Sequence, residues 1–417
     1  MSRKYTIWEN AGFFCIAGFL ISITFSKALS QMFLGLGLLA AIVIFIQDGK
    51  YRRSFSRDSV FWIILMYVVW SFVSSFFGTD ARQSLAYLLE DWLFIGIPVI
   101  AVMITSERRL FILLETFLLS ASLMSLYGIA QHFIGVDWYI STSLVSAPSA
   151  GFRAQGFFPN VMTYGNFFAI STLFLLGCAL HMETVKRRFF YYGGFILAAL
   201  AALLSYGRGP MGAIVIGLVT CLFFIPRRFL KYAAIFPVIL AALVYWAAPD
   251  ILFRHVNELQ TELKGEYIGS RQAIWRTAGR MIADHPLFGV GRGNFKPNSE
   301  IYRDEGGTRH YTHAHNDWLN VAASGGIPAL ILFIGMWLAI LVKMKTSIGR
   351  LREHRPLRGV MIGCFLASIV FVVASFYEAT FDDTEVRLLL TGIWGVFYGM
   401  TELVKKNTET ADYREMA

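Results

Sequence analysis

Apolar runs follow one another along most of the chain, from Phe13 to Leu403, with short polar stretches between them. Each run holds about 17–22 residues, which is enough for a helix to cross a hydrocarbon core about 30 Å thick. We therefore predict an all-α polytopic membrane protein with about twelve transmembrane helices. The predicted spans cover residues 11–26, 31–47, 58–77, 86–104, 111–134, 161–182, 189–206, 210–226, 232–248, 325–344, 358–378 and 386–403.

The basic residues alternate from one connector to the next. The connectors after the second, fourth, sixth, eighth and tenth predicted spans carry clusters of Lys and Arg, and so does the C-terminal tail. The opposite short connectors carry one basic residue each or none, namely Lys27, Arg82, Arg153 and Arg208. Because cytoplasmic loops are enriched in Lys and Arg, we expect both termini to be cytoplasmic.

One connector, residues 249–324, is far longer than the others and is expected on the non-cytoplasmic side. It divides the chain into nine helices over 1–248, this loop, and three helices with a cytoplasmic tail over 325–417. It holds five of the chain's eight histidines. Its middle, from Ser270 to Asp284, has apolar residues at helical spacing, which predicts an amphipathic helix on the membrane surface. Pro286 should end that helix, and the GVGRG stretch at 289–293 should form a turn.

Composition narrows the class further. Hydrophobic residues make up 56% of the 417 positions and charged residues 16%, whereas soluble domains have roughly 45–50% apolar and about 25% charged residues. The net charge of +9 is dispersed in short clusters and forms no stripe for nucleic acid. The sequence has no G-x-x-x-x-G-K-[ST] loop, no H-E-x-x-H and no Cys-x-x-Cys pair, and its G-V-G-R-G-N stretch follows no βαβ strand. We therefore expect none of the cofactors that these motifs bind.

The segment from Arg309 to Asp317, RHYTHAHND, is the first candidate for chemistry. Its histidines at 310, 313 and 315, together with Asp317, have a spacing that could hold a divalent cation. One imidazole could instead act as a general base on a hydroxyl nucleophile, or the segment could be a solvated loop edge. His315 and Asn316 directly precede an apolar run, so we expect them at the membrane surface, where a lipid-linked substrate presents its headgroup.

Three single arginines on the expected outer face stand among glycines. They are Arg153 in GFRAQGFFPN, Arg208 in SYGRGPMG and Arg271 in YIGSRQAIW. An arginine at a membrane boundary is commonly a snorkelling anchor. A guanidinium also forks onto phosphate oxygens, and glycine lets a ligand approach the backbone closely. Three such residues around one chamber would bind a diphosphate without a metal ion.

Six carboxylates lie near the same face. They are Glu90, Asp91, Glu378, Asp382, Asp383 and Glu385. Ionisable groups at membrane depth favour a functional role, whereas helix ends that face water explain these residues equally well. Both interpretations stay open.

Taken in order, four stretches resemble the bacterial O-antigen ligase and polymerase family of integral membrane glycosyltransferases. They are Gly151–Asn160 (GFRAQGFFPN), Leu203–Gly212 (LLSYGRGPMG), Arg271–Phe295 (RQAIWRTAGRMIADHPLFGVGRGNF) and His315–Leu330 (HNDWLNVAASGGIPAL). The last two are the more specific, because they combine the HPLFGVG turn with His-Asn before a glycine-rich re-entry. Two positions depart from the family. Gly207 stands where Ser or Thr is usual, and Ser324 stands where an acidic residue is common, which removes a possible helper carboxylate.

The resemblance implies a GT-C-like enzyme in the inner membrane of a Gram-negative bacterium, with a periplasmic active site. As an O-antigen ligase it would move a glycan from undecaprenyl diphosphate to a sugar hydroxyl of lipid A–core during lipopolysaccharide synthesis, inverting the anomeric centre. His315 would be the catalytic base, and the three arginines would stabilise the leaving diphosphate. We expect further substrate contacts from Tyr311, His313 and Asn316, membrane lipids around the bundle, and no metal, cofactor or nucleic acid.

Two other functions stay open. An O-antigen polymerase of the same family would use a lipid-linked glycan as the acceptor. A twelve-span secondary transporter would be expected to show paired halves with broken helices and charges at the midplane. Here the ionisable residues cluster at one face and the single long loop is asymmetric, which disfavours transport.

Overall fold

The computed structural model describes residues 5–139, 142–147, 151–225, 271–304 and 311–415. The predicted span at 232–248, His255 and His310 lie outside these ranges. Every other predicted span overlaps a helix. The described chain is almost entirely helical, with one short antiparallel pair of strands.

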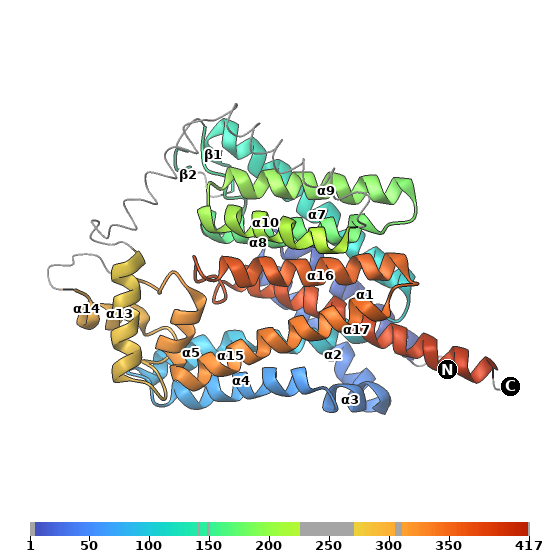
Figure 1. The fold of residues 1–417 in the computed structure, drawn as a ribbon, viewed down its shortest axis with the longest axis horizontal. Helices are drawn as coiled ribbons and strands as arrows, with labels where there is room; N and C mark the ends of the chain where they lie inside the picture. The colour runs from blue at the N-terminus through green and yellow to red at the C-terminus, as the bar shows by residue number, and fades with distance from the viewer. Residues whose placement is uncertain (1–4, 140–141, 148–150, 226–270, 305–310, 416–417) are drawn as a thin grey trace.

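The helices form a bundle in which most of them run along the long axis, and α1 begins at the same end at which α17 finishes (Figure 1). The elements are α1 (Tyr5–Ser22), α2 (Lys27–Gln47), α3 (Gly49–Ser56), α4 (Ser59–Ser75), α5 (Ala81–Leu88), η1 (Leu89–Ile95), α6 (Gly96–Met103), α7 (Glu107–Ile134), β1 (Val136–Asp137), β2 (Thr142–Ser143), α8 (Val161–Leu180), α9 (Val185–Leu204), α10 (Arg208–Cys221), η2 (Leu222–Phe224), α13 (Arg271–Asp284), α14 (Phe295–Tyr302), α15 (Asp317–Arg350), α16 (Arg355–Ala374) and α17 (Thr384–Glu415).

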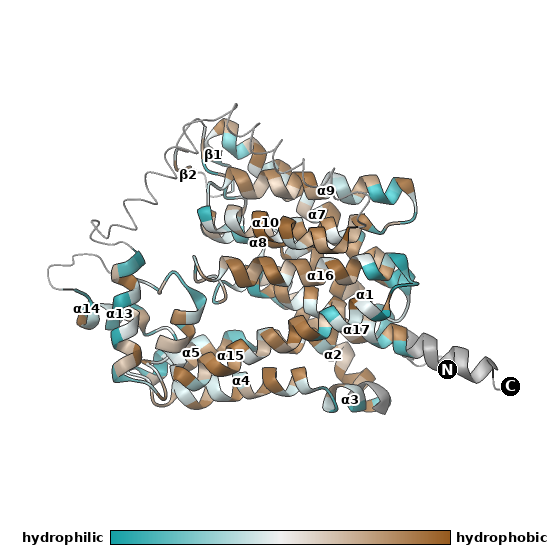
Figure 2. Ribbon diagram, in the orientation of Figure 1, coloured by the Kyte–Doolittle hydropathy of each residue, from teal (hydrophilic) through white to brown (hydrophobic). Residues whose placement is uncertain are grey.

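Seven helical segments of the described chain are long and apolar enough to cross a membrane, by length and composition. Three shorter apolar helices accompany them, at Ile7–Ser22, Ser59–Ser75 and Arg208–Phe224. Figure 2 shows hydrophobic residues along the middle of the bundle and hydrophilic residues gathered near helix ends and on α13. Large apolar side chains such as Phe14 and Ile46 are 71% and 76% exposed, as a surface that contacts lipid requires. These features are those of a polytopic membrane protein, and the count of twelve spans stays a prediction.

Helix α8 lies at the centre of the bundle. Every residue from Thr163 to Ala179 is buried, as expected for a helix that is apolar on all sides. At Gly177 a Cβ atom would overlap the backbone of Gly363 in α16. Glycine therefore lets these two helices pack backbone to backbone, which is a common way to join helices in a membrane.

The polar loop elements gather at the end of the bundle opposite the termini (Figure 1). The predicted amphipathic helix is confirmed as α13, which ends at Asp284 before Pro286. The predicted turn is also confirmed, because Gly289, Gly291 and Gly293 all have positive φ, a conformation that glycine adopts without strain.

The start of α15 differs from the prediction. The helix begins at Asp317 and not at residue 325, and it is broken at Gly326, whose φ is 78°. At the break, the Ile327 N–H donates to the carbonyl of Pro286 at 2.8 Å, and the Val290 N–H donates to that of Ala323 at 2.8 Å. The polar residues Asp317, Asn320 and Ser324 interrupt the apolar run in the first turns of α15, so the apolar pattern alone placed the start too late. The loop turn is thereby fixed to the segment that carries His315.

Candidate active site

His315 stands at the turn that leads into α15. Its φ is 47°, in the left-handed region that residues other than glycine rarely occupy. The imidazole Nδ1 lies 2.6 Å from Oε1 of Glu378, in the connector between α16 and α17. When Nδ1–H donates to this carboxylate, Nε2 is the ring nitrogen that can accept a proton. The His315 side chain is 37% exposed, so it is accessible from solvent.

Glu378 contacts both the imidazole and a guanidinium. Its side chain is only 7% exposed, and its Oε2 lies 4.0 Å from Nη2 of Arg271. Arg271 Nε also donates to the carbonyl of Tyr377 at 3.3 Å. Burial would raise the pKa of Glu378, but the hydrogen bond from His315 and the charges of His313 and Arg271 outweigh it and lower the pKa. Glu378 is therefore a carboxylate at neutral pH.

His313 supports the same turn. Its ring centroid lies 4.3 Å from that of His315, and its Nδ1 accepts the His315 backbone N–H at 3.2 Å. Burial, together with the charge of His315, lowers the pKa of His313. His313 is therefore neutral at neutral pH and holds the backbone of the turn.

Asn316 and Asp317 fasten this turn to the α16–α17 connector. Asn316 caps α15 by accepting the Leu319 N–H, and its Nδ2 donates to the carbonyl of Phe376 at 3.2 Å. The buried Asp317 carboxylate accepts the backbone N–H groups of Thr380 and Phe381 at 3.3 and 2.9 Å. Both residues therefore hold the backbone that presents His315 and Glu378 to each other.

Arg153 and Arg208 lie together on another part of the same end. Arg153 follows the strand pair, and its Nε donates to the carbonyl of Ser205 at 2.8 Å, just before α10 begins at Arg208. Burial and the charge of Arg208 lower the pKa of Arg153, so the two guanidinium groups are close enough to repel each other. Nη2 of Arg153 is buried and has no hydrogen-bond partner among the described residues. An anion between the two groups would relieve this repulsion.

The two arginine sites converge at Tyr377. A Cβ atom at Gly209, next to Arg208, would lie 3.4 Å from Cβ of Tyr377. The carbonyl of Tyr377 is the one that Arg271 binds. The start of α10, next to Arg208, therefore packs against Tyr377, which binds Arg271 and directly precedes Glu378.

Tyr311 has different surroundings. It is buried in a small apolar cluster with residues of α13 and α14, among them Ile274, Met281 and Phe295. Its backbone N–H donates to Oγ of Ser299 at 3.3 Å. Tyr311 therefore packs with the loop helices, whereas His313 binds the His315 backbone and Asn316 binds Leu319 and Phe376.

One group of described side chains could hold a metal ion. One ligand atom from each of His313, His315 and Glu378 lies within 4.8 Å of the others, and imidazole with carboxylate is a donor set that divalent transition metals accept. The expectation that Asp317 is the carboxylate beside the histidines is wrong, because its oxygens bind backbone amides. In this structure His315 instead donates to Glu378.

A second cluster of charged side chains anchors the connector between α16 and α17 to neighbouring segments. Asp382 accepts hydrogen bonds from Arg292, Arg387 and Asn320 at 2.8, 2.9 and 3.0 Å. Asp91 accepts from the same two arginines. Burial would raise the pKa of Asp382, but the charges of Arg292 and Arg387 outweigh it and lower the pKa. The sequence identified the two aspartates only as carboxylates near the outer face, and it gave no role to the two arginines. The feature that could have identified these arginines is a charged residue beside or within an apolar run.

The fold and this site define a polytopic helical membrane protein with a His–Glu pair and three arginines at one end. A protein-family model described as O-Antigen ligase matches residues 193–334. The resemblance is thus supported, because over this segment the chain is similar to the O-antigen ligase family. The segment contains Arg208, Arg271, His313 and His315, whereas Arg153 and Glu378 lie outside it. A comparison with curated proteins found no match. This similarity supports a function of the O-antigen ligase or polymerase type in general.

Proposed function

We propose that this protein is an O-antigen ligase of the bacterial inner membrane. It transfers a glycan from undecaprenyl diphosphate to a sugar hydroxyl of lipid A–core on the periplasmic side, with inversion and without a metal. The observation that carries the proposal is the 2.6 Å contact between His315 Nδ1 and Glu378 Oε1. The other oxygen of Glu378 lies 4.0 Å from the Arg271 guanidinium. This arrangement supplies a base and a cation at one place, which glycan transfer from a diphosphate requires.

In the proposed reaction, Nε2 of His315 takes the proton of the acceptor hydroxyl. The oxygen attacks the anomeric carbon, and the bond from that carbon to the diphosphate oxygen breaks. Nδ1–H of His315 donates to Glu378 throughout, so the carboxylate orients the ring and stabilises the imidazolium that forms. The same arrangement orients the histidine of serine hydrolases. Glu378 would supply the carboxylate that Ser324 does not.

The leaving diphosphate carries away the electrons of the broken bond. Arg153, Arg208 and Arg271 would neutralise this developing charge with fixed guanidinium groups. The buried Nη2 of Arg153 has a free donor for a phosphate oxygen within the described part of the chain. Permanent charge of this kind needs no proton transfer and no metal ion.

The test is a reaction with purified protein, undecaprenyl-diphosphate-linked glycan and lipid A–core, without any nucleotide. Mass analysis should show lipid A–core gaining the glycan mass, and the released lipid should carry a diphosphate. Lipid A–core that stays unmodified while the lipid-linked glycan grows longer would make the protein a polymerase. If neither product forms and glycan accumulates inside sealed vesicles, the protein would be a transporter and the proposed function would be wrong.

A further inference from the structure

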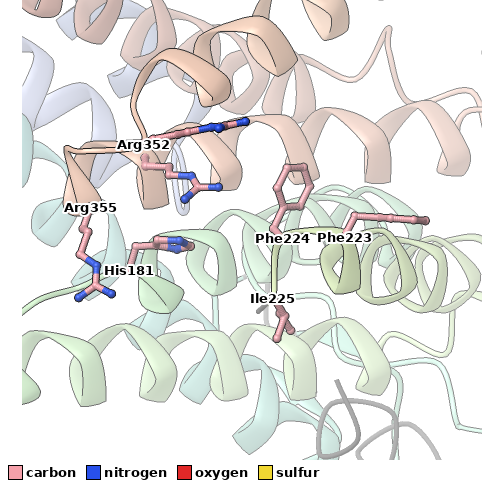
Figure 3. A pocket seen from close by; sticks show the side chains of 7 residues that line it. His181, Phe223, Phe224, Ile225, Arg352 and Arg355 are labelled. Carbon is pink, nitrogen blue, oxygen red and sulfur yellow. The ribbon is translucent and has the colours of Figure 1, made fainter. Parts of the chain in front are cut away.

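A pocket with a polar wall lies at the end of the bundle opposite the candidate active site, near the C-terminus of α8 and the N-terminus of α16. Its volume is about 380 Å³. Figure 3 shows His181, Arg352 and Arg355 on one side of it and Phe223, Phe224 and Ile225 on the other. Arg358, one turn into α16, completes the lining. The proposed reaction uses none of these residues.

Among the described residues, no carboxylate pairs with the positive charges of this pocket. Arg352, Arg355 and Arg358 form no ion pair with a carboxylate of the described chain, although Glu183 and Glu353 are close in sequence. Nε of Arg358 is buried and has no hydrogen-bond partner among the described groups, and the same holds for Nδ1 of His181. Buried polar atoms are nearly always paired, so these atoms indicate a missing acceptor.

The backbone adds to the positive potential. Helix α16 begins at Arg355 within the pocket lining, and its N-cap residue His354 makes no capping hydrogen bond through its side chain. The first amides of a helix attract anions, in particular phosphate. Burial, with the charges of Arg358 and Arg355, lowers the pKa of His181 to about 4. The imidazole is therefore neutral at neutral pH and can donate to an anion from one nitrogen.

The opposite wall is apolar and open. Phe223 is 85% exposed, next to a polar wall of arginines, so the pocket fits a molecule with an anionic head and an apolar body. Helices α16 and α8 pack closely beside the pocket, because a Cβ atom at Gly359 would lie 2.9 Å from Cβ of His181. Basic pockets between helices on the cytoplasmic side of membrane proteins suit anionic lipid headgroups. The positive-inside rule places this end in the cytoplasm.

We propose that this pocket binds the phosphate of an anionic phospholipid from the cytoplasmic leaflet. The phosphate lies among Arg352, Arg355 and Arg358 at the start of α16, and the acyl chains lie against Phe223 and Phe224. The inference is independent of the proposed reaction, which belongs to the other end of the bundle.

The experiment measures lipid binding to the purified full-length protein by native mass spectrometry, with phosphatidylglycerol and phosphatidylcholine as the probes. The double variant Arg352→Gln/Arg355→Gln removes two pocket charges. The matched control, Lys345→Gln/Arg350→Gln, removes two exposed charges near the end of α15, outside the pocket lining. We expect phosphatidylglycerol to bind the unmodified protein more tightly than phosphatidylcholine. The pocket variant should lose about 30-fold in affinity for phosphatidylglycerol, since each basic residue near an anionic surface contributes about 1 kcal/mol, and the control should change less than about threefold.

Two further measurements distinguish binding of a phospholipid from binding of a soluble phosphate. Phe223→Ser should weaken the binding of phosphatidylglycerol, and inorganic phosphate or glycerol 3-phosphate should not displace the lipid. Equal losses in the pocket and control variants would show diffuse surface attraction and overturn the proposal. Equal affinity for the two lipids would overturn it as well, and displacement by soluble phosphate would make the pocket a site for a soluble anion.

Discussion

At the scale of single residues, the proposed chemistry depends on which nitrogen of His315 is free. Glu378 occupies Nδ1, and the left-handed backbone of His315 holds the ring against that carboxylate. Strained backbone of this kind persists when surrounding contacts fix it, and it is frequent at functional sites. Here Asn316 and Asp317 provide those contacts.

Replacing His315 tests the base directly. His315→Ala should lower the turnover of purified protein by about 10²-fold or more, the usual scale for loss of a general base. Binding of the lipid-linked donor should largely survive, because the arginines remain. His313→Ala is the matched control and should cost less. If His315→Ala retained near-normal turnover, His313 would become the candidate base.

Glu378 is expected to act through His315. Glu378→Gln keeps an oxygen that can accept the Nδ1–H bond but removes the charge that favours an imidazolium. Turnover should fall, and the acidic limb of the pH–rate profile should move to lower pH, because the neutral imidazole then persists in more acidic solution. A loss of turnover with an unchanged pH profile would indicate that Glu378 serves only the fold.

The arginines are expected to bind through their fork geometry. Arg271→Lys keeps the charge but loses the bidentate contact, so turnover should fall by about tenfold or more. Arg276→Lys is the matched control on the same helix, where the native residue pairs with Asp304 in solvent; it should stay near normal. Arg208→Lys should behave like Arg271→Lys. If both lysine variants kept full activity and only neutral variants failed, the arginines would act through their positive charge alone and not through bidentate contacts.

Metal dependence separates the two chemical interpretations of the histidines. We expect full turnover in excess EDTA. A divalent ion at His313, His315 and Glu378 would displace the His315–Glu378 hydrogen bond and stand close to the Arg271 guanidinium. Two unit charges at 4 Å repel by about 4 kcal/mol at an effective dielectric constant near 20. Loss of turnover with EDTA, restored by one added metal, would contradict both this prediction and the role of His315.

At the scale of elements, the connector between α16 and α17 carries the site, and buried ion pairs hold it in place. Asp382 joins the glycine-rich turn through Arg292, α17 through Arg387 and α15 through Asn320. Asp91 of η1 binds the same two arginines. The cluster therefore joins four segments, namely the glycine-rich turn, η1, α15 and α17, to one another beside the connector that carries Glu378.

Breaking this cluster should be costly. Arg292→Gln leaves the buried Asp91 carboxylate partly unpaired, and loss of one partner of a buried ion pair costs about 3–5 kcal/mol. We expect a clear fall in the unfolding midpoint in detergent, together with reduced turnover. Arg276→Gln, which breaks an exposed pair with Asp304, should cost no more than about 1 kcal/mol. Similar midpoints for the two variants would show that the buried cluster contributes little to stability.

At the scale of the whole molecule, the two ends of the bundle differ in chemistry. One end combines His315, carboxylates and three arginines, whereas the other collects arginines that form no ion pair within the described part of the chain. A transferase that works on one side of a membrane needs this asymmetry, because donor and acceptor must meet on one face.

The orientation can be measured in spheroplasts with a membrane-impermeant maleimide, in a Cys15→Ser background. Thr312 and Glu353 are exposed positions at opposite ends of α15. Thr312→Cys should label from outside, and Glu353→Cys should label only after the membrane is opened, because the positive-inside rule places Glu353 in the cytoplasm. The reverse pattern would invert the predicted topology and move the proposed active site to the cytoplasm.

The sequence by itself determined the membrane class, the approximate positions of most long helices, the turn after α13 and the resemblance to the O-antigen ligase family. These properties follow from local patterns, namely the length of apolar runs, the placement of Pro286 and glycines, and the spacing of short motifs. The pattern failed at the start of α15, because polar residues such as Asn320 and Ser324 are buried there by neighbouring segments. Apolar periodicity carries no information on such contacts.

Only the tertiary structure decided which charged groups meet. Glu378 lies 63 residues from His315, and Asp91 lies 201 and 296 residues from its two arginines. Six carboxylates near one face were equivalent in the sequence, yet one of them binds the candidate base and two bind buried arginines. Asp317, a further carboxylate that stands next to the histidines in the sequence, binds backbone amides. The physical reason is that an ion pair requires a few ångströms between two specific atoms. That distance is set by helix packing and connector geometry and not by neighbours along the chain.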